Sequence, residues 1–233
     1  MDNQEVRQDT FEHLDELRTR LIKMLIALLL AVAGSFFFAD KILDILATPI
    51  GGLQNLQAIE VTENASVFMR VSLLSGFILA FPFLIFQLLR FIEPGLEPDE
   101  NRSVYIFVVL ATVLFLVGAA FSYFIMLPPA LQFLTGFLGT PMIPRLQSYI
   151  NFTTGMVFWT GISFETPLIF FFLAKFKIVT PKGLLRQWRL AIVAISILAA
   201  VISPTIDPMN MLIIMAPLVV LYFLSILLTL MAR

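Results

Sequence analysis

Acidic side chains are concentrated in two segments of this chain, where together they could bind a cationic ligand. Residues 1–23 hold six carboxylates and residues 90–102 hold four, whereas residues 175–189 hold five bases and no acid. The ten carboxylates are Asp2, Glu5, Asp9, Glu12, Asp15, Glu16, Glu93, Glu97, Asp99 and Glu100. Clustered charge of one sign attracts partners of the opposite sign. The pattern indicates either a docking surface for a cationic peptide or, more simply, loops that acids keep soluble.

One further acid, Glu165, lies near the middle of an apolar run. An ionised side chain at the centre of a bilayer costs at least about 2.5 kcal/mol, so this carboxylate needs a partner or a water-filled concavity. Gly161, Phe158 and Thr154 share its helix face. Three interpretations are open: close helix packing through small residues, a proton or ion relay, or a polar seat for another membrane helix. A relay normally needs further titratable groups at depth, and the sequence offers none.

Several kinds of chemistry are excluded by composition. Cysteine is absent, which removes disulfides, thiolate metal sites and cysteine nucleophiles. His13 is the only histidine, so neither a Ser-His site nor a metal-dependent intramembrane site can be assembled. The net charge of −1 predicts no general attraction to nucleic acid. We therefore expect no catalytic residues, no metal site and no bound cofactor.

The elements that must position these acids are membrane-spanning helices. Of the 233 residues, 59% are apolar and 13% charged, against about 45–50% and about 25% in soluble domains. Mostly apolar runs of about 20 residues can each span a bilayer. Six such runs predict an all-α integral membrane protein with a single domain: residues 21–39, 68–89, 104–127, 149–174, 190–206 and 209–231. The first is not a cleavable signal peptide, because its apolar run continues past the apparent cleavage site.

Basic residues set the orientation of these spans. With the N-terminus in the cytoplasm, twelve lysines and arginines lie on the cytoplasmic side. Lys41 and Arg145 lie on the opposite side, with Arg70 at the start of a helix. This bias predicts six spans with both termini cytoplasmic. The long, mostly uncharged outer loops, residues 40–67 and 128–148, predict a structured cap.

Residues 1–20 are predicted to form an amphipathic cytoplasmic segment, with a helix that begins at Asp9 or Thr10. Glu16 and Arg20 have the favourable spacing for an ion pair within a helix. Arg18 instead falls on the apolar side, where it either extends to the interface or pairs with a carboxylate of another segment. Prolines are expected to bend the second, fourth and sixth spans; they are Pro82, Pro167 and Pro217.

Several motifs, in order along the chain, resemble the TatC family, the multispanning core of the twin-arginine protein translocase. The run Phe11 to Leu21 is similar to the "HLxELRxRL" signature of that family. The other matching positions are Pro49, the run Phe91 to Leu96, Glu100, Tyr123, the run Phe164 to Pro167 and, after a one-residue gap, Asp207.

The resemblance implies a receptor and scaffold, without enzymatic activity, in the cytoplasmic (inner) membrane. It would bind signal peptides that carry two arginines through Glu16, Glu100, Phe91 and Arg18. Arginine forms paired hydrogen bonds with a carboxylate, which lysine cannot reproduce. A partner or intramembrane polar site would comprise Glu165, Tyr123, Pro49 and Asp207. The implied partners are folded cargo and the single-span proteins TatA and TatB, with possible self-association and energy from the proton motive force.

Two alternatives remain open. A secondary transporter of a small solute would use Glu165 as its coupling site. An intramembrane hydrolase would need a catalytic serine and lacks a histidine within the spans to activate it.

Overall fold

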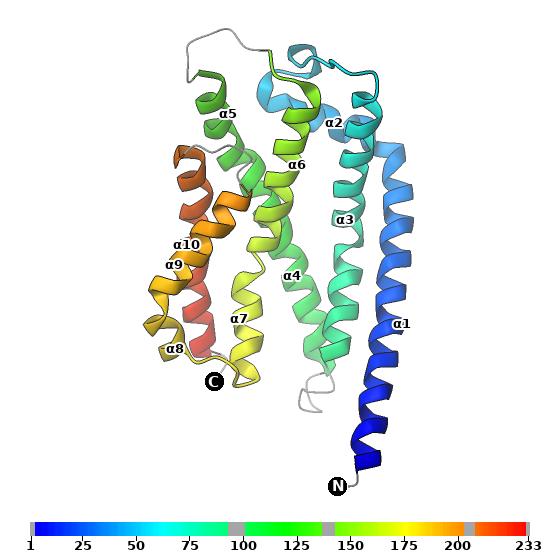
Figure 1. Ribbon diagram of the computed structural model, residues 1–233, viewed down its shortest axis with the longest axis vertical. Coiled ribbons are helices and arrows are strands. Elements are labelled where there is room, and N and C mark those ends of the chain that lie inside the picture. Colours follow the sequence, from blue (N-terminus) through cyan, green and yellow to red (C-terminus); the bar gives the residue numbers. More distant parts are fainter. Residues whose placement is uncertain (1–2, 93–100, 137–142, 203–207, 232–233) are drawn as a thin grey trace.

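Long helices run roughly side by side along the long axis of the molecule (Figure 1). The computed structural model describes residues 3–92, 101–136, 143–202 and 208–231, and within these ranges it contains no β-strand. The helices are α1 (Asn3–Ser35), α2 (Ala39–Ala47), α3 (Glu63–Ile92), α4 (Asn101–Phe121), α5 (Leu127–Gly136), α6 (Leu146–Ser163), α7 (Thr166–Lys175), α8 (Pro181–Arg186), α9 (Trp188–Ile202) and α10 (Pro208–Met231). Five helical segments are long and apolar enough to cross a membrane, and α9 is a shorter apolar helix. The predicted all-helical membrane fold is confirmed.

One expectation about the helices is corrected. Helix α1 begins at Asn3 rather than at Asp9 or Thr10, and it continues without a break into the first apolar run. Its first 31 residues contain neither glycine nor proline, so nothing interrupts the helix before Asp9. The capping signal at Asp9 therefore lies inside the helix and does not mark its start. Helices α3 and α10 pass through Pro82 and Pro217 as single helices. Only the fourth run is split, at the turn that separates α6 from α7.

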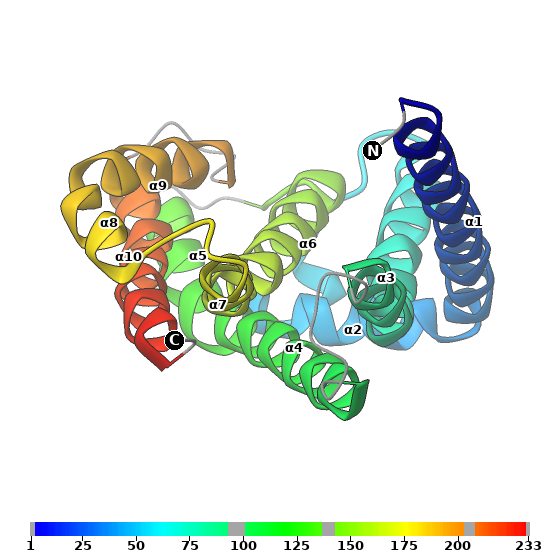
Figure 2. The same ribbon diagram turned by 90° about the horizontal axis from the view of Figure 1, so that it is seen from below.

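The helices are arranged in two groups that α4 and α6 connect (Figure 2). Helix α1 packs against α3 at one edge, and α7, α9 and α10 pack together at the other. Much of the core is contributed by α5, α6 and α10, and it includes Ile150, Met156 and Ile214. Apolar side chains of α1 such as Leu25 and Leu29 remain exposed, as expected for a surface that faces lipid.

Helices α1 and α3 approach each other closely at Gly76. A Cβ atom added to Gly76 would lie 2.5 Å from the Cα atom of Val32, which is closer than real Cβ contacts. Lipid tails are as apolar as leucine, so membrane helices associate through such close packing rather than by escaping water. Gly76 therefore fixes the position of α1 on α3.

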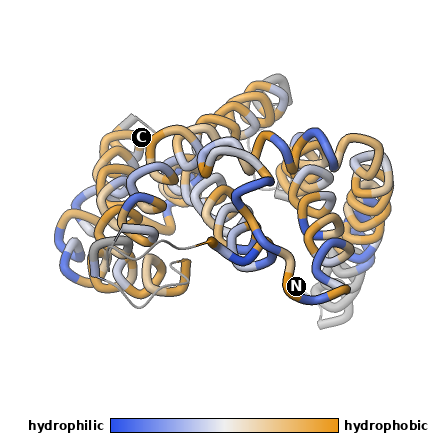
Figure 3. The backbone as a smooth tube through the Cα atoms, turned by 90° about the horizontal axis from the view of Figure 1, so that it is seen from above, coloured by the Kyte–Doolittle hydropathy of each residue, from blue (hydrophilic) through white to orange (hydrophobic). Residues whose placement is uncertain are grey.

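The predicted cap is present at the end of the molecule where α3 begins. It consists of α2, two 3-10 turns (Thr48–Ile50 and Leu53–Asn55), and the bridge between Gln57 and Arg145. The backbone N–H of Leu146 donates to the carbonyl of Gln57 at 2.9 Å. In the view from this side, the helices are largely hydrophobic and hydrophilic segments gather between them (Figure 3). We call this end the cap side.

A buried ion pair joins the two loops of the cap. The Glu63 side chain has no exposed surface, and it accepts hydrogen bonds from Arg145 and from the backbone N–H of Ile59, the latter at 3.1 Å. A second nitrogen of Arg145 lies 2.7 Å from the carboxylate of Glu60. The hydrogen bond with Glu63, and then that with Glu60, raises the pKa of Arg145, so the guanidinium stays charged.

Replacement of Glu63 by glutamine tests this pair. Glu63→Gln turns one buried acceptor into a donor that faces the donors of Arg145, and we expect it to lower the free energy of unfolding by about 1 to 3 kcal/mol. Glu60→Gln is the control, because the Glu60 side chain is 60% exposed and surface pairs contribute about 0 to 1 kcal/mol. Thermal unfolding in detergent at one scan rate compares the variants. Equal melting temperatures for the two would contradict this assignment.

Candidate functional site

A groove with charged walls lies at the end of the molecule opposite the cap, between α1 and the last turns of α3. Its volume is about 580 Å³. The lining residues are Asp15, Glu16, Thr19, Arg20, Lys23, Phe86, Gln87 and Arg90. We call it the charged groove. Phe86 and Gln87 were not singled out from the sequence, although a glutamine within an apolar run signals a polar contact between helices.

Glu16 is held in this groove by Arg20, one helical turn along α1. The Nε atom of Arg20 donates to Oε1 of Glu16 at 2.9 Å, and Nη2 of Arg20 donates to the same oxygen. Nη1 of Arg20 also donates to Oε1 of Gln87 at 3.5 Å, which connects the pair to α3. The Glu16 side chain is 35% exposed and that of Arg20 only 17%. The carboxylate is therefore fixed in position and still reachable from outside.

The walls of the groove carry two acids and three bases, so the described part of it is not acidic overall. The second acidic segment includes Glu93, Glu97, Asp99 and Glu100, and it lies outside the described residues. It continues from the end of α3, and Glu93 follows the groove residue Arg90 by three positions. Any excess of negative charge at this end must come from that segment and from the acids that precede the groove in α1.

Phe91 and Arg18 do not line the groove. Phe91 is half-buried at the end of α3, next to Arg90. Arg18 is exposed on α1, and among the described residues no carboxylate forms an ion pair with it. Residues 16, 19, 20 and 23 share one face of α1, and position 18 lies on another. The structure therefore does not bring Arg18 to Glu16.

Glu165 lies in the turn between α6 and α7 and is 6% exposed. Among the described residues, nothing forms a hydrogen bond with its Oε1 atom. Its neighbour Phe164 packs against α4, where a Cβ atom on Gly118 would lie 2.7 Å from the ring. A Cβ atom on Gly161 would likewise lie 2.6 Å from the ring of Phe115. The small residues beside Glu165 thus pack α4 closely against α6, and the carboxylate is left with unused hydrogen-bonding capacity.

The residues predicted to accompany Glu165 lie in or near the cap. The hydroxyl of Tyr123 donates to the carbonyl of Ile45 at 2.5 Å, which ties a π-helical turn (Ser122–Met126) to α2. Pro49 lies in the 3-10 turn Thr48–Ile50 that follows α2. Asp207 is outside the described residues. Tyr123 thus ties α2 in place and Pro49 lies in the cap, at the opposite end of the molecule from the charged groove (Figure 1).

Neither place has the composition of a metal site. Among the described residues, no group of three or more histidine, cysteine, aspartate or glutamate side chains could hold a metal ion. The geometry is suited to binding rather than to metal chemistry. Glu16 is a positioned carboxylate between α1 and α3, and Glu165 is a buried carboxyl group at the turn between α6 and α7.

Comparison with known proteins covers nearly the whole chain. The family model described as "Sec-independent protein translocase protein (TatC)" matches residues 12–217. The TatC protein of Aquifex aeolicus is 37% identical over 225 residues, which cover 92% of each chain. That of Koribacter versatilis is 34% identical, over 92% of this chain and 82% of its own. A solved structure described as a twin-arginine translocase receptor, TatC, superposes with a TM-score of 0.84 at 37% identity, over 94% of this chain and 99% of that one.

The close contact beside Glu165 can be tested with alanine. Gly118→Ala places a methyl group against the ring of Phe164, and overpacking of this kind destabilises a protein by about 1 to 3 kcal/mol. Gly155→Ala is the matched control in α6, because no atom lies within 4 Å of its added Cβ. We expect a lower melting temperature in detergent for Gly118→Ala and an equal or higher one for Gly155→Ala. The same change in both variants would contradict the proposed contact.

Proposed function

Because the chain belongs to the TatC family of Sec-independent protein translocase proteins, we propose that it is the receptor and scaffold of a twin-arginine translocase. It binds the twin-arginine signal peptides of folded cargo and recruits single-span TatA- and TatB-like subunits for export. The observation that carries the proposal is the carboxylate of Glu16, held in an open groove between α1 and α3. The protein has no catalytic residue or cofactor in this role, and it uses the proton motive force.

The distribution of basic residues supports an orientation with the charged groove in the cytoplasm. Lys175, Lys182 and Arg186 lie at the ends of helices on the same side as the groove, whereas Lys41 and Arg145 lie on the cap side (Figure 1). Short loops rich in lysine and arginine stay cytoplasmic. The protein is therefore a multi-pass protein of the inner membrane with both termini in the cytoplasm, and it can associate with further copies of itself.

An incoming signal peptide has to compete with Arg20 for Glu16. Arg20 already donates two N–H groups to Oε1 of that carboxylate. The guanidinium of a signal peptide can offer a similar planar pair of donors, but an ammonium group cannot. When the peptide's arginine replaces Arg20, the Glu16 carboxylate still accepts two hydrogen bonds from a guanidinium group. This competition explains why the receptor selects arginine over lysine.

The second arginine of the signal is assigned to Glu100, with Phe91 as an accompanying contact. Phe91 belongs to the end of α3 and follows the groove residue Arg90 in the sequence, and Glu100 belongs to the segment outside the described residues. Arg18, exposed on another face of α1, acts on the site indirectly by fixing how α1 lies. Two carboxylates from separate segments of the chain would make the spacing of the two arginines part of what is recognised.

Binding of purified signal peptides tests this assignment. We expect a peptide with Arg-Arg to bind the wild type at least about tenfold more tightly than the same peptide with Lys-Lys, since charge-assisted hydrogen bonds contribute about 1.5 to 3 kcal/mol. Glu16→Ala and Glu100→Ala should each remove most of this preference. Asp40→Ala, an exposed acid on the cap side, is the control and should keep it. Equal binding in all combinations would overturn the proposal.

Glu165 is the candidate contact for a partner inside the membrane. Its buried carboxyl group can form a hydrogen bond with a polar side chain of an inserted signal or of a single-span subunit. Tyr123, Pro49 and Asp207 are assigned to the same partner site, and Asp207 lies outside the described residues. The same burial would suit a secondary transporter with Glu165 as its coupling site. Replacement of Glu165 would impair protein export if the chain is a translocase subunit, and solute uptake if it is a transporter.

Export of a folded reporter protein into inverted membrane vesicles distinguishes them. We expect Glu165→Leu to reduce export at least about tenfold while binding of the Arg-Arg peptide stays unchanged, because the polar contact is lost and the groove is not. Glu165→Gln keeps a polar group of the same shape and should retain part of the export. Normal export by both variants would contradict the role in the translocase and would favour a transporter.

A further inference from the structure

Arg70 is a cation inside a membrane-spanning helix. The sequence placed it at the start of a helix, but α3 begins at Glu63, so Arg70 lies two turns further in. Its Nε atom donates to Oγ1 of Thr154 in α6 at 3.0 Å. Among the described residues, no carboxylate forms an ion pair with it. Arg70 is exposed, and charged side chains within spans normally face a partner or a polar cavity, so its remaining guanidinium nitrogens are open to an anionic or polar group.

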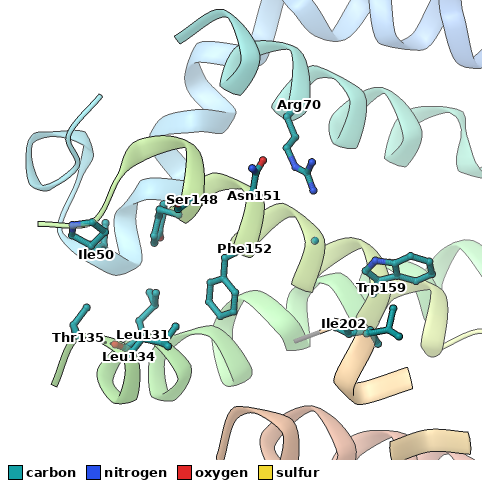
Figure 4. A pocket seen from close by; sticks show the side chains of 14 residues that line it. Ile50, Arg70, Leu131, Leu134, Thr135, Ser148, Asn151, Phe152, Trp159 and Ile202 are labelled. Atoms are coloured by element: carbon teal, nitrogen blue, oxygen red, sulfur yellow. Dashed lines mark hydrogen bonds between the residues drawn. The ribbon is translucent and has the colours of Figure 1, made fainter. Parts of the chain in front are cut away.

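Two cavities meet at this guanidinium. The larger, of about 650 Å³, lies between α3, α5, α6 and α9, and the smaller, of about 400 Å³, lies between α1, α3 and α6. Arg70, Gly155 and Trp159 line both. Figure 4 shows Arg70 extending from α3 toward α6, beside Asn151, with Leu131 and Leu134 of α5 across the cavity. The larger cavity thus has polar groups at Arg70 and largely apolar walls beyond.

The depth of Arg70 matches the edge of a bilayer. Helix α3 has 30 residues and is about 45 Å long, which exceeds the hydrocarbon thickness of about 30 Å by roughly 15 Å. Arg70 follows the first residue of α3 by seven positions, or about 10 Å. If the helix is centred, the Cα atom of Arg70 lies within a few ångströms of the hydrocarbon edge on the cap side. A long arginine side chain readily extends from there to the level of the headgroups.

We propose that Arg70 and the larger cavity form a binding site for one glycerophospholipid of the cap-side leaflet. The guanidinium binds the phosphate, and the side chains of Ser148 and Asn151 of α6, which line the same cavity, offer further donors. One acyl chain occupies the cavity between α5, α6 and α9, against Leu131, Phe152 and Ile202. The volume falls within the range of about 300 to 1,000 Å³ that is typical of ligand sites. The lipid would fill the space between the two groups of helices.

Free phosphate fits only half of this site, because it leaves the apolar walls without an occupant. A carboxylate on a helix of another protein is a different partner, and the experiment separates it from a lipid. The site shares no residue with the charged groove and does not include Glu165. The lipid proposal can therefore fail without affecting the proposed receptor function, and the reverse also holds.

Quenching of Trp159 fluorescence by lipid tests the proposal. The chain has two tryptophans, so Trp188→Phe leaves Trp159 as the reporter at the cavity. In detergent micelles, we expect phosphatidylglycerol with brominated acyl chains to quench this parent protein in a saturable way. Arg70→Gln should weaken binding about tenfold or more, as expected for the loss of a charge-assisted contact to phosphate. Arg70→Lys should lie between the two, because it retains the charge without the planar fork.

A second variant blocks the cavity and leaves the charge in place. Gly155 lines both cavities and has no atom within 4 Å of an added Cβ, so Gly155→Leu can fill the space without a clash at that atom. We expect it to abolish saturable quenching. Gly34→Leu is the matched control: it lies in α1, also has an open Cβ position, and lines neither cavity. Lys41→Gln controls for the loss of an exposed cation on the cap side.

Four results would overturn the proposal. They are equal quenching of the parent and Arg70→Gln, quenching that rises without saturation, equally tight binding of brominated diacylglycerol, and displacement of the lipid by inorganic phosphate. Equal quenching of the parent and Arg70→Gln would indicate instead that Arg70 pairs with a carboxylate on a helix of another protein. Saturable binding that requires the phosphodiester, Arg70 and the open cavity would establish the lipid site.

Discussion

The structure depends on close approach of helix backbones in a setting where lipid competes for every apolar surface. Burial of leucine against leucine gains little over leucine against lipid, so shape and proximity decide which helices associate. Gly76 brings α3 against the backbone of α1, while Gly118 and Gly161 exchange contacts with Phe164 and Phe115 across α4 and α6. These contacts fix two things on which function depends: the wall of the charged groove and the position of the break at Glu165.

Within this frame, the placement of charge separates structural from functional residues. Glu63 and Arg145 satisfy each other and hold the cap, so they leave nothing for a ligand. Glu16 is also paired, but with an arginine that a second arginine can replace. Glu165 and Arg70 differ from both, because each retains hydrogen-bonding capacity inside a membrane-spanning segment. In a chain with 13% charged residues, a polar group left unsatisfied within a membrane-spanning helix is the feature most in need of a partner.

The sequence predicts what depends on local periodicity and little of what depends on neighbouring helices. The apolar runs predict the helices, and the spacing of Glu16 and Arg20 predicts their ion pair, since both follow from one turn of a helix. The capping pattern predicts a helix that begins at Asp9 or Thr10, but α1 begins at Asn3. No glycine or proline precedes Asp9, so nothing interrupts the helix before that residue. The contact of Arg20 with Gln87 and that of Arg70 with Thr154 join residues 67 and 84 positions apart. No local pattern contains that information.

The ion pair between Glu16 and Arg20 explains how an acidic segment of the sequence can form a groove whose walls are not acidic overall. Counting charges along the first 23 residues suggests a negative surface, yet the groove walls carry more bases than acids. A site with a bare, unpaired carboxylate would attract any cation. A site where Arg20 already satisfies Glu16 rejects cations that cannot replace both of its donated hydrogen bonds, because an unreplaced bond leaves a partly buried group unsatisfied. In the proposed receptor function, selectivity for arginine would therefore arise from the competing base in the groove, and the acidic segment after α3 would supply the long-range attraction.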